Sequence, residues 1–107
     1  MALTRDFRET VLERARSEPA YRRGLLTRGV AFMVSGDAED RAVGRALVRD
    51  YINATIGFQR LGEDLGRKPQ SLMRMFSSTG NPRLNSLADV IHRLQEHEGI
   101  HIEVGPK

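Results

Sequence analysis

The sequence predicts an all-α fold, a small helical domain that contains a helix-turn-helix and a short C-terminal β-strand. Apolar residues recur at helical spacing along most of the chain, glycine and proline interrupt these stretches, and one short stretch near the end alternates at period 2. A chain of 107 residues can bury one hydrophobic core and has little room for a second. Residues 1–107 are therefore expected to form a single domain.

Residues 1–57 are predicted to form three N-terminal helices, which cover residues 4–17, 19–35 and 38–55. Gly29 lies inside the second helix, where glycine weakens a helix. The expected apolar stripes are Phe7, Val11, Leu12 and Ala15 in the first helix, Tyr21, Leu25, Leu26, Phe32 and Met33 in the second, and Ala42, Val43, Ala46, Leu47, Tyr51 and Ala54 in the third.

Three arginines, Arg41, Arg45 and Arg49, repeat at i, i+4 and i+8 along the third predicted helix. Such a stripe could serve as a nucleic-acid or partner surface. Acidic residues such as Glu39 and Asp50 lie beside it, which is more typical of a solvated helix face. We therefore expect the stripe to face solvent.

Residues 58–77 carry the pattern of a helix-turn-helix, two short amphipathic segments joined by a glycine-containing turn. Gly62 is expected where the second helix approaches closely, and Gly66 is expected to end the first segment in the left-handed conformation. Pro69 suits the first turn of the second helix, since its missing N–H has no intrahelical partner there. The apolar stripes are Leu61 and Leu65 in the first segment, and Leu72, Met75 and Phe76 in the second.

The outward face of the second segment is polar. It would present Lys68, Gln70, Ser71 and Arg74, whose side-chain types contact phosphates and base edges. Residues 58–83 hold five basic residues against two acidic ones, so they account for the net charge of +3 of the whole chain. These features predict DNA binding. Two short helices with a glycine turn also occur, however, in helical domains that bind no nucleic acid.

Residues 78–99 are predicted to form a polar loop followed by a last helix that Asn85 caps and that ends near Gly99. Residues 100–107 form the tail, in which residues 100–104 alternate at period 2 and predict a short strand. Because strands are stable only when paired, we expect this strand to pair with its copy in a second subunit. The apolar stripe of the last helix is Leu87, Val90, Ile91 and Leu94.

Several function classes are excluded or disfavoured by what the chain lacks. It contains no cysteine, which removes disulfides, thiolate metal ligands and cysteine nucleophiles. His92 and His97 stand five residues apart and do not share a helix face, and no P-loop, dinucleotide or nucleophile-elbow spacing occurs. We expect no enzyme, no metal site and no cofactor. Without a bilayer-length apolar run or a secretory signal, a cytoplasmic protein with no membrane partner is expected.

Read from Phe58 onward, the chain resembles the helix-turn-helix of phage-repressor-like transcriptional regulators. That family has a small residue where Gly62 stands, glycine at Gly66 and apolar residues at four positions that are filled here. The continuation Ser-Leu-Met-Arg-Met-Phe-Ser-Ser-Thr-Gly-Asn-Pro is similar to the addiction-module antidote proteins, the HigA-like antitoxins. In these, a Ser-Leu-X-X-X-Leu recognition helix leads into a Gly-Asn-Pro loop. The resemblance covers residues 56–104 well and residues 1–55 weakly.

The resemblance implies that one face of the second helix reads DNA in the major groove. Gln70 and Arg74 would read base edges, since Gln pairs naturally with adenine and Arg with guanine. Arg67 departs from the family pattern, which normally buries an aliphatic residue there, so it could reach a phosphate or the turn could be repacked. The other implied DNA contacts are Lys68 and Ser71 to bases or phosphates, Gln59 to the backbone, and Ser78, Thr79 and Asn81 to phosphates.

The resulting expectation is a sequence-specific regulator of transcription that binds double-stranded DNA, as a homodimer on a palindromic operator. The resemblance further implies an autoregulating antitoxin with a toxin protein as partner. The alternative is a helical protein–protein interaction module without specific DNA recognition, in which residues 1–57 bear the partner surface.

Overall fold

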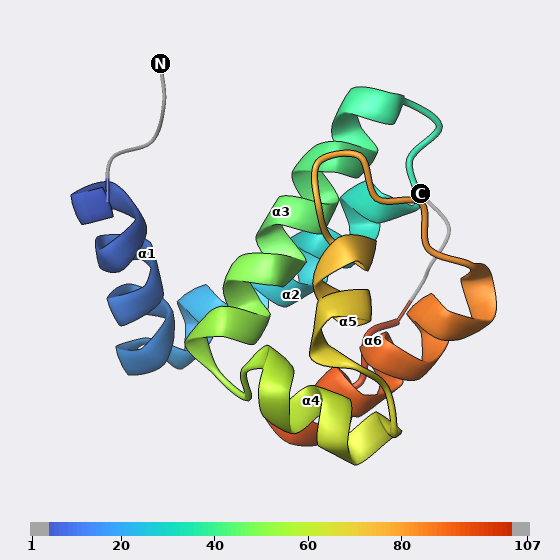
Figure 1. Ribbon diagram of the computed structural model, residues 1–107. Helices are drawn as coiled ribbons and strands as arrows, with labels where there is room; N and C mark the ends of the chain where they lie inside the picture. The colour runs from blue at the N-terminus through green and yellow to red at the C-terminus, as the bar shows by residue number, and fades with distance from the viewer. Residues whose placement is uncertain (1–4, 104–107) are drawn as a thin grey trace.

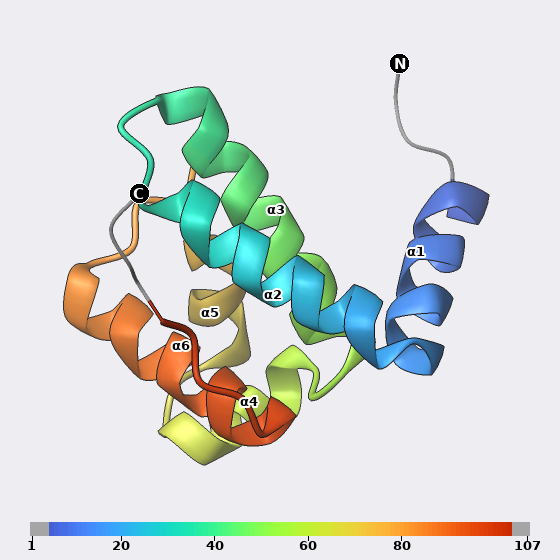
Figure 2. The same cartoon turned by 180° about the vertical axis from the view of Figure 1, so that it is seen from behind.

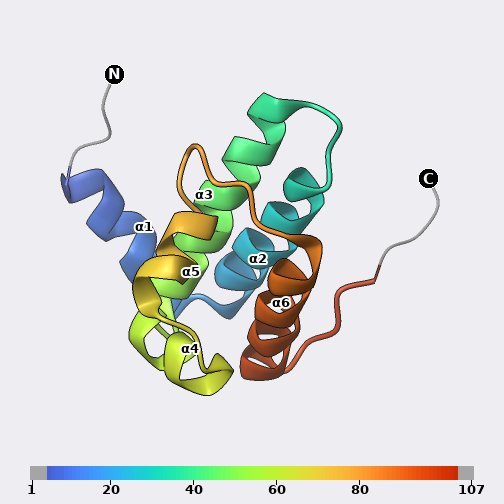
Figure 3. The same ribbon diagram turned by 45° about the vertical axis from the view of Figure 1, so that its right-hand side comes forward.

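The computed structural model describes residues 5–103, and these residues are all-α. Figure 1 shows α2 and α3 side by side as antiparallel neighbours, with α1 at the end of the pair where α2 begins. Figure 3 shows α5 and α6 against the α2–α3 pair. The helix α4 lies beside α5 and α6 and contacts both. The radius of gyration is 13.3 Å, about that of a compact chain of this length. The helices are α1 (Arg5–Ser17), α2 (Pro19–Met33), α3 (Ala38–Ala54), α4 (Phe58–Leu65), α5 (Pro69–Met75) and α6 (Leu84–Glu98).

Two glycines bring α2 and α3 together. A Cβ built on Gly44 would lie 2.6 Å from the carbonyl oxygen of Gly29, and one built on Gly29 would lie 2.7 Å from a methyl group of Val48. No side chain fits between the helix backbones at this crossing. The helix α2 therefore continues through Gly29, because the close packing offsets the helix-weakening effect of glycine.

The same crossing corrects the apolar face predicted for α3. Val43 is 48% exposed, whereas Val48 and Ile52 are fully buried although the predicted stripe omitted both. Gly44 must face α2, and residues four and eight positions later share its face. The buried apolar residues are Ala15, Leu25, Leu26, Val48, Tyr51, Ile52, Ala54, Phe58, Leu61, Leu72, Phe76, Val90 and Leu94.

Two aromatic residues predicted to be in the core lie largely outside it. Phe7 is 53% exposed near the start of α1, while Ala15 near the other end of that helix is fully buried. Phe32 is exposed near the end of α2. Both lie near an end of their helix.

The helix boundaries follow the predicted pattern with small shifts. The helix α2 ends at Met33, two residues before the predicted boundary, and α6 begins at Leu84 with Arg83 in the N-cap position. Gly99 adopts the left-handed conformation (φ 72°, ψ 32°) and ends α6 as expected.

The predicted C-terminal strand is wrong for residues 100–103, which form no strand; residue 104 lies outside the described residues. Figure 2 shows this segment returning along α6. The amide of Ile100 donates to the backbone oxygen of Gln95 (3.1 Å), and the amide of Ile102 donates to the Gln95 side-chain oxygen (2.7 Å). Both isoleucines pack against the core of their own chain. The period-2 alternation therefore reflects burial against a helix.

Candidate nucleic-acid interface

The turn between α4 and α5 has the geometry that its glycines and proline predict. Gly66 adopts the left-handed conformation (φ 65°, ψ 35°), and the amide of Arg67 donates to the carbonyl of Gly62 (2.9 Å). A Cβ built on Gly62 would lie 2.6 Å from the backbone oxygen of Arg67. Pro69 begins α5. Glycine at position 62 thus permits the chain to fold back tightly enough to start a second helix.

Burial on one side of α5 decides which side chains it presents on the other. Leu72 and Phe76 are fully buried, and Met75 is partly buried against the core. Successive residues of an α-helix are rotated by about 100°, so Gln70 and Arg74 lie nearly opposite Leu72. Both are exposed, as predicted.

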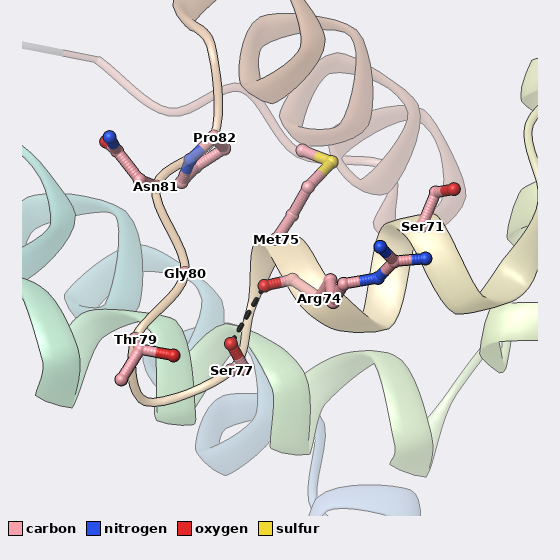
Figure 4. A pocket seen from close by; sticks show the side chains of 8 residues that line it. All are labelled: Ser71, Arg74, Met75, Ser77, Thr79, Gly80, Asn81 and Pro82. Atoms are coloured by element: carbon pink, nitrogen blue, oxygen red, sulfur yellow. Dashed lines mark hydrogen bonds between the residues drawn. The ribbon is translucent and has the colours of Figure 1, made fainter.

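A hollow of about 350 Å³ opens between α5 and the loop of residues 77–82 (Figure 4). Four of the predicted DNA-contacting residues line it, namely Ser71, Arg74, Thr79 and Asn81. The hydroxyl group of Ser77, where the loop begins, donates to the backbone oxygen of Arg74 on α5 (2.9 Å). The structure therefore brings helix and loop residues, predicted separately, to one concave site.

The remaining predicted residues lie around this hollow or apart from it. Gln59, Lys68, Gln70 and Ser78 are exposed and line no part of it. Gln59 stands in the first turn of α4, and Lys68 occupies the N-cap position of α5. Lys68 therefore lies at the α4–α5 turn, whereas Gln59 lies at the other end of α4.

Arg67, in the turn between α4 and α5, forms an ion pair at the surface. Its guanidinium group reaches the carboxylate of Asp89 on α6 at 3.3 Å. The side chain thus links the α4–α5 turn to α6 instead of entering the core, and it is 37% exposed.

Asp64 on α4 forms ion pairs with two arginines. Asp64 accepts hydrogen bonds from Arg60 (3.1 Å) and Arg93 (3.1 Å). The hydrogen bond from Arg60, joined by the one from Arg93, outweighs the opposing effect of burial and holds the pKa of Asp64 below its ordinary value. Asp64 therefore stays ionised and keeps both arginines engaged.

Three basic residues of residues 58–83 have no ion pair inside the described part of the chain. They are Lys68, Arg74 and Arg83. Lys68 precedes α5, Arg74 lies on its last turn, and Arg83 follows the loop. The sequence shows five basic residues in this region, and the ion pairs of Arg60 and Arg67 leave these three.

The arginine stripe of α3 is not the solvated face that the sequence predicted. Arg45 donates to the backbone oxygens of Ser77 (2.9 Å) and Ser78 (2.8 Å). Arg49 reaches the carbonyl of Phe76 at 3.4 Å. Cations are favourable at the C-terminal end of a helix, where carbonyl groups lack intrahelical partners. The i, i+4 spacing of these arginines was the available signal, but their partners lie 27 to 33 residues along the chain.

Residues 5–103 contain neither a metal-binding cluster nor a membrane-spanning helix. No group of three or more His, Asp or Glu side chains is placed to hold a metal ion in that range. None of the helices described there has both the length and the apolar character of a bilayer span.

Comparisons of the chain with protein-family models, with curated proteins and with solved structures find no match.

Proposed function

We propose that this protein is a sequence-specific regulator of transcription that binds double-stranded DNA. In this proposal α4 and α5 act as a helix-turn-helix of the phage-repressor type, and α5 enters the major groove. The observation that carries the proposal is the exposed polar face of α5, with Gln70 and Arg74 opposite the buried Leu72. The short α4–α5 turn with left-handed Gly66 supports the same assignment.

The proposed contacts divide by chemistry. Gln70 and Arg74 read base edges, since amide and guanidinium groups can pair in a bidentate manner with adenine and guanine. The other contacts help to fix the register of α5 on the duplex, and those to phosphates carry no sequence information directly. They come from Lys68 and Ser71 at bases or phosphates, from Gln59 at the backbone, and from Ser78, Thr79 and Asn81 at phosphates.

We further propose that the protein binds a palindromic operator as a homodimer, because a single helix-turn-helix unit buries little surface and gains affinity by doubling the half-site. The similarity of residues 56–104 to addiction-module antidote proteins supports an autoregulating antitoxin as the physiological role, with a toxin protein as its partner.

A second candidate function, a protein-interaction module without specific DNA recognition, is favoured by apolar exposure around the α2–α3 turn. Val34 is 74% exposed, and Phe32 and Val43 are also exposed near this end of the helix pair. Exposed apolar clusters often mark interaction surfaces. In an antitoxin the two functions would coexist on different faces.

The test is fluorescence anisotropy of the protein on DNA from its own promoter and on scrambled DNA of equal length, across a salt series. Specific recognition requires tighter binding to the promoter by about 10³ or more. The affinity should also fall steeply with salt as condensed counterions are released. Equal and weak binding to both duplexes would contradict the proposal, and no binding to either would favour the interaction module.

A further inference from the structure

The loop of residues 77–82 is held in place from α3. The guanidinium group of Arg45 bridges two consecutive carbonyls, with its Nε 2.9 Å from the oxygen of Ser77 and a terminal nitrogen 2.8 Å from the oxygen of Ser78. Only arginine presents donors in a rigid fork that matches such a pair, since a lysine ammonium is a point charge on a flexible stem. These backbone oxygens immediately precede Thr79, which lines the hollow.

The loop is also pressed against the C-terminal end of α5. A Cβ built on Gly80 would lie 2.7 Å from the backbone oxygen of Arg74 and closer still to that of Met75. No side chain fits there, so glycine permits the loop to approach the helix. The amide of Gly80 also donates to the oxygen of Ser77 (3.0 Å). The loop is therefore held against α5 by this close approach and tied to α3 by Arg45.

We propose that Arg45 is a positioning residue that holds the loop as a preformed phosphate-contacting edge beside α5. This inference rests on the proposed DNA-binding function and extends it to a residue on α3 that touches no DNA. Thr79 and Asn81 supply the phosphate contacts, and Arg45 removes the entropy cost of ordering them on binding.

The Arg45→Ala variant should bind promoter DNA and scrambled DNA more weakly by the same factor, about tenfold. The factors should agree because phosphate contacts carry no sequence information directly. The salt dependence should stay unchanged, since Thr79 and Asn81 are neutral and release no counterions. If Arg45 itself contacted a phosphate, the slope of log affinity against log salt would fall by about one.

A double-mutant cycle separates positioning from a general effect on folding. Thr79→Ala should weaken binding in the wild-type background and should have little further effect in the Arg45→Ala background, because the loop is already displaced. The matched control is Arg41→Ala, one turn earlier on α3, whose guanidinium binds the oxygen of Ser35 in the α2–α3 turn at 2.8 Å. The changes in the free energy of DNA binding caused by Arg41→Ala and by Thr79→Ala should be additive.

Additive effects of Arg45→Ala and Thr79→Ala, or unchanged binding by Arg45→Ala, would overturn the inference while leaving the proposed function intact. Wild-type protein that binds neither duplex would overturn both. Should Arg45→Ala fail to fold, Arg45→Lys serves in the cycle, since it keeps the charge and can satisfy only one of the two carbonyls well. It should show a smaller loss of the same kind, equal on both duplexes, and no loss would again overturn the inference.

Discussion

Ion pairs within the protein decide which basic side chains of residues 58–83 remain available for the proposed DNA contacts. Arg60 shares Asp64 with Arg93, and Arg67 pairs with Asp89, so the charges of these arginines are partly neutralised. Arg74 has no such partner inside the described range. Its position opposite a buried leucine makes it the strongest candidate for a base contact.

Replacing Arg74 by alanine should weaken specific promoter binding by about 1–3 kcal/mol and relax the sequence preference, because a bidentate contact to a base would be lost. Competition anisotropy with single-base operator variants measures both effects. Arg28→Ala on α2 is the matched control, since it removes the same charge from a helix that contributes nothing to the hollow. Unchanged promoter affinity in Arg74→Ala would remove Arg74 from the reading set.

Packing of the α4–α5 pair depends on Gly62. Alanine at this position should strain the turn by about 1–3 kcal/mol, because its Cβ would meet the Arg67 oxygen at 2.6 Å and backbone cannot give way cheaply. This exceeds the gain of up to about 1 kcal/mol that alanine normally brings to a helix.

Urea denaturation of Gly62→Ala should therefore show a lower free energy of unfolding than the wild type. Gly36→Ala is the control, since a Cβ built there has no neighbour within 4 Å. Equal stability of the two variants would show that the turn accommodates a side chain.

Glu98 joins three helices at one end of the molecule. Its side chain is only 3% exposed, and it accepts hydrogen bonds from Arg22 and Arg23 of α2 (3.0 Å each) and from Tyr51 of α3 (2.6 Å). Burial by itself would raise the pKa of Glu98, but these hydrogen bonds outweigh it and hold the pKa below its ordinary value of 4.5. Burial and the bond to Glu98 raise the pKa of the Tyr51 hydroxyl.

The sign of the resulting pH dependence follows from linkage. Because the folded-state pKa of Glu98 is lowered, its contribution to stability is fully present above pH 4.5 and is lost as the pH falls through the lowered pKa. Glu98→Gln should cost about 1.5–3 kcal/mol at neutral pH, the usual value of hydrogen bonds to a charged group.

Thermal or urea unfolding across pH 3–7 measures this effect, and Glu98→Gln should show a weaker loss of stability in acid than the wild type. The control is Glu96→Gln, an exposed residue on the same helix. If the stability of both variants falls with decreasing pH as that of the wild type does, Glu98 is not the source of the pH dependence.

Assembly of the whole molecule on DNA gives a further prediction. If two copies bind one operator, sedimentation of the complex should give two chains per duplex, with half-sites about one helical turn (~34–36 Å) apart. Dimerisation cannot rely on a strand at residues 100–103, since that segment packs against its own α6. One chain per duplex at saturation would remove the homodimer from the proposal.

Local patterns in the sequence determined the helices and the turn that joins α4 to α5. Apolar periodicity specifies a buried face, and Gly66 and Pro69 specify how one helix ends and the next begins. The polar face of α5 followed directly, since the opposite face carries Leu72 and Phe76. These conclusions needed only residues a few positions apart.

Tertiary structure alone decided the rest, because it depends on partners far apart in the chain. The register of α3 is set by contact between Gly29 and Gly44, and the hydrogen bonds of Arg45 are made to carbonyls 32 and 33 residues away. The isoleucines after Gly99 alternate as a strand would, but a nearby helix was available to bury them. An i, i+4 or period-2 pattern predicts that one face of a segment will be buried. Which surface buries that face depends on the tertiary packing of the whole chain.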